Sequence, residues 1–162
     1  MFGWGTATWG RLGLSDPIHV DGPPIFAPKR ISVVGIDGKE SVVSSAACGH
    51  YHSLLVDKDG RVFSAGRATD GQLGLGSRHN VCRFTQVTKG VLSRRRVVAV
   101  SAGELHSLAL LDDGAVAAWG WEADGRLGRG TTTFDVLDEN QDGFPSDIPG
   151  WVKMDAPVVE VR

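Results

Sequence analysis

A glycine-rich phrase occurs three times in this chain, and its repetition constrains the fold more than any other feature. The phrase reads GRLGLS at 10–15, GQLGLG at 71–76 and GRLGRG at 125–130. Around the second and third copies, residues 48–76 and 102–130 align without a gap at an offset of 54 residues. A repeat of this period is typical of stacked architectures such as β-propellers.

The residues that recur are glycines, a His-Ser pair and a leucine. They are Gly49, His52, Ser53, Gly60, Gly66, Gly71, Leu73 and Gly74 in one copy, and Gly103, His106, Ser107, Gly114, Gly120, Gly125, Leu127 and Gly128 in the other. We interpret this set as the structural motif of the repeat. It predicts complete units at 42–95 and 96–157, the second with an acidic insertion, the tail of a unit plus a long connection at 1–41, and the start of a further unit at 158–162.

Each unit predicts short β-strands. The apolar runs SLLV and SLALL precede DKDG and DDG, and RVFSAG and AVAAWG follow them. An Asp-Gly pair between two such runs is a strong hairpin signal. Because the runs are apolar at consecutive positions, we expect both of their faces to be buried. The sequence therefore predicts an all-β fold of sheets stacked face to face, as in the blades of a β-propeller.

The repeated phrase itself is predicted to be a turn and not a ligand site. Glycines permit positive φ angles and close approach of the backbone, as a tight exit from a blade requires. Leu12, Leu73 and Leu127 are expected to pack each turn onto its sheet.

In these motifs the chain resembles the regulator-of-chromosome-condensation repeat family. The family pattern runs G-x-x-H-S, an Asp-Gly hairpin, W-G and then G-x-L-G-x-G. GHYHSLLVDKDGRVFSAG and GELHSLALLDDGAVAAWG fit it closely, except that Ala65 replaces the tryptophan seen at Trp4 and Trp119. The resemblance implies a seven-bladed propeller that serves as an interaction platform. Members include a nucleotide exchange factor for a small nuclear GTPase, ubiquitin-ligase subunits, ciliary scaffolds and a plant ultraviolet-B photoreceptor.

The chain is short for such a ring. Seven blades at this period need roughly twice the 162 residues present. We therefore expect an incomplete propeller, either a piece of a longer protein or a stack completed by another chain, since open blade faces favour aggregation.

Net charge, hydropathy and cysteine content restrict the cellular environment and the partners that we expect for this chain. The net charge of −2 gives no general attraction to nucleic acid. The N-terminus lacks the pattern of a signal peptide, and no apolar run is long enough to span a membrane. Two cysteines form no disulfide framework. We expect an intracellular, soluble protein, with the compartment open.

Two sequence motifs resemble metal-binding sites, and for each we favour an interpretation without a metal. Cys48, His50 and His52 alternate and would share one face of a strand, as zinc ligands can, but His52 is the repeat histidine and a structural role is favoured. The insertion DENQDG fits the start of a calcium loop with Asp138, Asn140 and Asp142 as ligands. It lacks the glutamate at position 12 and flanking helices, so an acidic surface loop is the favoured interpretation and no cofactor is predicted.

Catalysis has little support. The neighbouring His-Ser pairs point to opposite faces of a strand and form no hydrolase arrangement, so an imidazole bonded to nearby backbone is the simpler role. The phrase GRATDG lies between strands without a following helix and fails as a phosphate loop.

Partner-binding candidates lie outside the repeat motif. Trp9 and Trp121 are extra aromatics near the turns, and Arg94, Arg95 and Arg96 form a basic run before a strand. Connections 14–41, 77–95 and 131–157 are expected to carry function. We predict a non-enzymatic protein-interaction scaffold, with a guanine-nucleotide exchange regulator of a small GTPase as the alternative.

Overall fold

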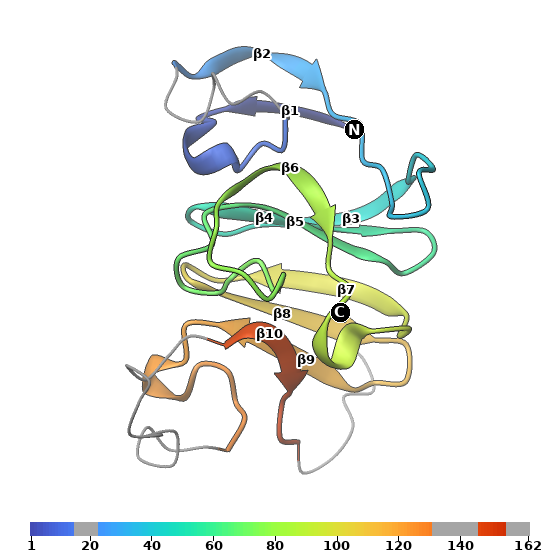
Figure 1. Cartoon of the computed structure of the whole chain (residues 1–162), viewed down its shortest axis with the longest axis vertical. Coiled ribbons are helices and arrows are strands. Elements are labelled where there is room, and N and C mark those ends of the chain that lie inside the picture. The colour runs from blue at the N-terminus through green and yellow to red at the C-terminus, as the bar shows by residue number, and fades with distance from the viewer. Residues whose placement is uncertain (15–22, 131–145, 155–162) are drawn as a thin grey trace.

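The structure, a computed structural model, describes residues 1–14, 23–130 and 146–154. This part of the chain forms antiparallel sheets that lie one above another (Figure 1). The first sheet has two strands, β1 (Phe2–Gly5) and β2 (Ile25–Arg30). The all-β fold of stacked, blade-like sheets predicted from the repeat is confirmed.

The second and third sheets are four-stranded meanders in chain order. The second contains β3 (Val43–Cys48), β4 (His52–Asp57), β5 (Val62–Gly66) and β6 (Val81–Gln86). The third contains β7 (Val97–Ala102), β8 (His106–Leu111), β9 (Val116–Gly120) and β10 (Ser146–Trp151). Short 3-10 turns η1 (Thr8–Gly10), η3 (Gly90–Leu92) and η4 (Ala123–Gly125) connect strands.

The β4–β5 hairpin is closed by a buried aspartate. The Asp57 carboxylate accepts the backbone N–H of Asp59 at 3.0 Å and of Arg61 at 2.9 Å, and the Arg61 Nε at 2.7 Å. Gly60 has a φ of +80°, which suits glycine and explains the Asp-Gly signature. The hairpin predicted from DKDG is present.

The hydrophobic core lies between the sheets. Between the second and third sheets, Leu54, Val56 and Val62 pack with Leu111 and Trp119. A separate cluster joins the first and second sheets through Ile31, Val33, Leu55, Phe63 and Phe84. The second sheet thus contributes apolar side chains from both faces, and every residue of β4 and β5 is buried.

Burial in the third sheet differs from the expectation. Along β8, half-buried residues alternate with buried ones. Only one face of this sheet packs against another sheet in the described part of the chain, so the expected two-sided burial holds for β4 and not for β8.

Several predictions fall on residues outside this description. They concern Asp138, Asn140 and Asp142 of the calcium hypothesis, most of the insertion, and the proposed unit start at 158–162. Within the described ranges, the helices are too short and too polar to cross a lipid bilayer.

Candidate interaction surfaces

The repeat histidines pack against the repeat glycines. His52 is completely buried, and a Cβ placed on Gly49 would collide with the His52 ring. Gly103 has the same relation to the ring of His106. Glycine at the first position of G-x-x-H-S therefore makes room for the imidazole three residues later.

His52 forms a hydrogen bond to the next sheet. Its Nε2 lies 2.8 Å from the Ser107 Oγ, and that hydroxyl donates to the backbone carbonyl of Gln72 at 2.8 Å. Because the hydroxyl proton is engaged with the carbonyl, Nε2 must be the donor to Ser107, which leaves Nδ1 unprotonated and without a partner. The expected bond from the imidazole to nearby backbone is therefore replaced by a side-chain bond between sheets.

Burial sets the charge of His52. The pKa of His52 is lowered to about 4. Burial away from solvent is the larger cause, and electrostatic repulsion from His106 is the smaller one. The imidazole is neutral at physiological pH, as its role as a single donor requires.

The glycine-rich phrase receives a second bond from the same neighbouring sheet. Trp119 Nε1 donates to the Gln72 carbonyl at 2.9 Å. A Cβ on Gly74 would lie 2.8 Å from that Nε1, so only glycine leaves space for the indole. We call His52, Gln72, Ser107 and Trp119 the inter-sheet clamp.

The junction between the first and second sheets is built differently. Ala65 stands where the third sheet has Trp119, and Ser53 Oγ lies 3.8 Å from Cys48 Sγ. Arg11 replaces the missing contacts: its Nη1 donates to the His50 carbonyl at 2.7 Å, and its guanidinium lies 5.1 Å from the Tyr51 ring centre. The departure at Ala65 from the repeat pattern thus coincides with a different junction.

The zinc hypothesis brings no ligands together. Cys48 is exposed while His52 is completely buried, and His50 lies 3.5 Å from Glu104. Among the described residues, no three His, Cys, Asp or Glu side chains are grouped as metal ligands.

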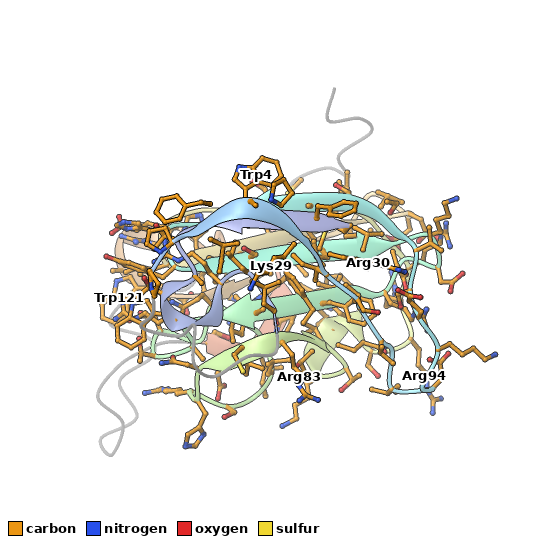
Figure 2. All side chains as sticks on the ribbon, turned by 90° about the horizontal axis from the view of Figure 1, so that it is seen from above. Trp4, Lys29, Arg30, Arg83, Arg94 and Trp121 are labelled. Carbon is orange, nitrogen blue, oxygen red and sulfur yellow. The ribbon has the colours of Figure 1, made fainter. Side chains whose placement is uncertain are left out.

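The candidate tryptophans and arginines lie apart. Trp9 is 37% exposed and has a positive φ of 65°, and Trp121 is half-buried. Figure 2 shows Trp121 and Arg94 at opposite ends of the sheets. The structure therefore does not combine them in one binding surface.

The three arginines have different environments. Arg95 pairs with Asp113 and lies 5.3 Å from the centre of the Trp151 ring, and Arg96 Nη2 donates to the Lys58 carbonyl at 3.0 Å. Arg94 is exposed and has a φ of +60°, which is strained for a residue other than glycine.

Arg94 borders a cavity of about 340 Å³ beside the junction of the second and third sheets. Leu92 and Val97 supply apolar walls, and Ile36 and Arg61 line the cavity from the second sheet's side. The Arg61 guanidinium is held by three carboxylates, and hydrogen bonding to Asp57 is the main cause that raises its pKa. The sequence analysis singled out Arg94 and not Ile36, because nothing in the repeat indicates that residues 58 positions apart line the same cavity.

Comparison with known families gives a match over most of the chain. The model described as "Regulator of chromosome condensation (RCC1) repeat" matches residues 1–56 and 59–110. A second model of the same description matches residues 43–72 and 97–126.

Several curated proteins are similar in sequence. The ultraviolet-B receptor UVR8 of Arabidopsis thaliana is 35% identical over 86% of this chain and 29% of its own length. The X-linked retinitis pigmentosa GTPase regulator of Canis lupus familiaris is 32% identical over 79% of this chain and 12% of its own length. The human E3 ubiquitin-protein ligase HERC2 is 37% identical over 82% of this chain and 2% of its own length. The chain spans less than a third of each relative.

Solved structures are similar in fold. Prp20p of Saccharomyces cerevisiae, whose binding to Gsp1p and histones is described with its structure, superposes with a TM-score of 0.74 at 23% identity, over 95% of this chain and 34% of that one. Human WBSCR16 gives a TM-score of 0.68 at 23% identity, over 95% of this chain and 35% of that one.

Proposed function

The chain belongs to the regulator of chromosome condensation (RCC1) repeat family, and from this premise we propose that it is a non-enzymatic protein-interaction module within a larger chain or assembly. The observation that carries the proposal is the difference in exposure between the repeat-motif residues and Arg94. The clamp side chains are buried between sheets, whereas Arg94 is exposed and strained beside a cavity. Binding residues are found most often on exposed loops that a rigid scaffold holds in place.

The Arg94 cavity is the proposed partner surface. Its walls combine apolar side chains with a guanidinium at the edge, which suits a partner segment that places a carboxylate next to an apolar residue. The triple carboxylate contact of Arg61 and the bond from the Ile36 N–H to Gln86 Oε1 at 3.1 Å fix the walls before a partner arrives. A preformed surface reduces the entropic cost of binding.

A comparative capture experiment tests this surface. Tagged protein carrying Arg94→Glu is compared with wild type and with a Lys29→Glu control, which reverses an exposed cation on β2. We expect a defined set of captured proteins to be lost from Arg94→Glu and retained by Lys29→Glu. Identical sets from all three proteins would argue against the Arg94 surface.

The alternative is a regulator that accelerates nucleotide release from a small GTPase. It is favoured by two similar proteins, one named a GTPase regulator and one described as binding Gsp1p. Release of a fluorescent guanine nucleotide from a panel of small GTPases tests it directly. Acceleration that saturates with this chain would establish exchange activity, and no acceleration at high protein concentration would remove this alternative.

A further inference from the structure

Ser93 and Arg94 form the tip of a β-turn between η3 and β7. Ser93 has a φ of −58° and a ψ of 119°, and Arg94 has a φ of +60°. The Arg95 N–H donates to the Leu92 carbonyl at 3.1 Å, which closes the turn. Turns of this shape, type II, favour glycine at the position that Arg94 occupies, so arginine is strained there. Strain of this kind is found most often at functional sites.

The turn projects into solvent while both of its ends are fixed in the core. Leu92 and Val97 are buried, whereas the four residues between them are all exposed. Ser93 also lines the cavity of about 340 Å³ that Arg94 borders. The Ser93 hydroxyl is therefore accessible to an enzyme and lies beside the proposed partner surface.

The sequence around Ser93 has a charge pattern that no other hydroxyl residue of the chain shares. Arginines occupy the three positions that follow it, 94–96, and no other serine or threonine has a lysine or arginine two positions later. A protein kinase with an acidic substrate groove selects an acceptor next to such a run, because the two charge patterns are complementary. Ser93 thus fits the substrate of a kinase of this class.

A phosphoryl group on Ser93 would lie next to an exposed guanidinium. It adds a charge of about −1.5 to −2 and strong acceptor oxygens. Arg95 and Arg96 already have partners within the molecule, whereas Arg94 is exposed at the tip of the turn. Arginine pairs strongly with phosphate because its planar guanidinium donates two parallel bonds. The phosphate would therefore occupy the cation that a partner's carboxylate needs.

We propose that Ser93 is a phosphorylation site and that its phosphate, held by Arg94, closes the Arg94 cavity to a partner that presents a carboxylate. In the transfer, Ser93 Oγ forms a bond to the γ-phosphorus of ATP while the bond to the β-phosphate oxygen breaks. ADP leaves, and the hydroxyl proton passes to a base of the kinase. The effect on binding rests on the proposed function of the Arg94 cavity, whereas the modification itself does not.

Kinase treatment of the intact chain tests the modification. Folded protein is incubated with ATP and a protein kinase that selects arginine at the second and third positions after its acceptor, and mass spectrometry locates the phosphate. We expect one phosphoryl group per chain, on Ser93. Ser93→Ala is expected to take up none, and Thr88→Val, which removes another exposed hydroxyl of the same cavity, is expected to react as wild type. No uptake by folded wild type, or equal uptake by Ser93→Ala, overturns the assignment.

Phosphorus NMR tests whether Arg94 holds the phosphate. A guanidinium beside the phosphate favours the dianion, so the midpoint of the phosphate titration is expected at lower pH in the folded protein than in the same protein unfolded in urea. Arg94→Asn removes the cation and tolerates the positive φ, so it is expected to return the midpoint to the unfolded value. Arg96→Gln, which removes a neighbouring cation, is expected to keep most of the difference. Equal midpoints in wild type and Arg94→Asn would overturn the role of Arg94.

The capture experiment separates this inference from the proposed function. Protein phosphorylated on Ser93 is expected to lose the same captured proteins as Arg94→Glu, and treatment with a phosphatase is expected to restore them. If the phosphorylated protein retains what Arg94→Glu loses, closure of the cavity is wrong and the partner surface stands. If Arg94→Glu loses nothing, the partner surface and its closure are both wrong, while kinase treatment and phosphorus NMR still decide whether Ser93 is modified and held by Arg94.

Discussion

At the residue scale, the inter-sheet clamp depends on a neutral imidazole. His52 donates from Nε2 and has no partner at Nδ1, so a second proton would place an unpaired charge in a closed site. The pKa of His52 is about 4 in the folded chain, against 6.5 for a free imidazole. Between these values the unfolded chain binds a proton that the folded chain does not, and stability falls as pH falls.

Acidification is therefore expected to weaken the folded state by up to about 3 kcal/mol through His52 alone, with the loss starting near pH 6.5 and levelling off near pH 4. Urea unfolding at several pH values measures it. His52→Gln keeps a donor toward Ser107 and removes the titration, so its stability should change less over this window. An equal decline in both proteins would contradict the assignment.

Trp119 gives a second prediction at this scale. Trp119→Phe keeps an aromatic ring in the core but removes the donor to the Gln72 carbonyl, and it is expected to lower the free energy of unfolding by roughly 1–2 kcal/mol. Trp4→Phe, the same change at an exposed counterpart, should leave the free energy of unfolding unchanged in dilute protein. Denaturant titration compares the two, and a similar effect at both sites would show that the bond contributes nothing.

At the element scale, one arginine bridges β10 and β9, which also pair through their backbones. Arg129 Nη1 donates to Ser146 Oγ at 2.7 Å, and its Nη2 contacts the carbonyls of Ala118 in β9 and Ile148 in β10. Burial lowers the pKa of Arg129, yet the guanidinium stays charged. The side chain thus bridges two strands whose register shifts between Ser146 and Gly150.

Arg129→Met keeps much of the side-chain volume and removes these bonds, so it is expected to release β10 while leaving β7 to β9 in place. Hydrogen exchange followed by mass spectrometry should show faster exchange in 146–151 and unchanged protection in 106–111. Unchanged exchange in 146–151 would mean that β10 is held by other contacts.

Elements near the repeat motif were predictable, and the connections were not. The Asp-Gly pairs locate the β4–β5 and β8–β9 hairpins because they fix a local turn. The bond from His52 to Ser107 joins residues 55 positions apart and depends on how the sheets stack. The local sequence around either residue therefore does not predict it. Arg129 sits at the repeat position of Leu75, and its role depends on the course of β10 after an insertion, which no repeat position predicts.

At the scale of the whole molecule, the sheets are joined by two kinds of junction. The second and third sheets share the clamp, while the first and second share the Arg11–Tyr51 contact and a smaller apolar cluster. The glycine-rich phrase at 71–76 thus has a structural role, because it accepts hydrogen bonds from the neighbouring sheet. We expect the connections between strands to bind partners. The first junction, without the tryptophan bond, is expected to open before the second.

A double-mutant cycle on His52 and Ser107 tests this account most directly. The two side chains belong to different sheets, and His52 Nε2 lies 2.8 Å from Ser107 Oγ. The unfolding free energies of wild type, His52→Ala, Ser107→Ala and the double variant give their coupling. The account predicts a coupling of about 1 kcal/mol, because each single change removes the same inter-sheet bond. A coupling of zero, with the two losses simply adding, would contradict the claim that the bond between His52 and Ser107 joins the second and third sheets.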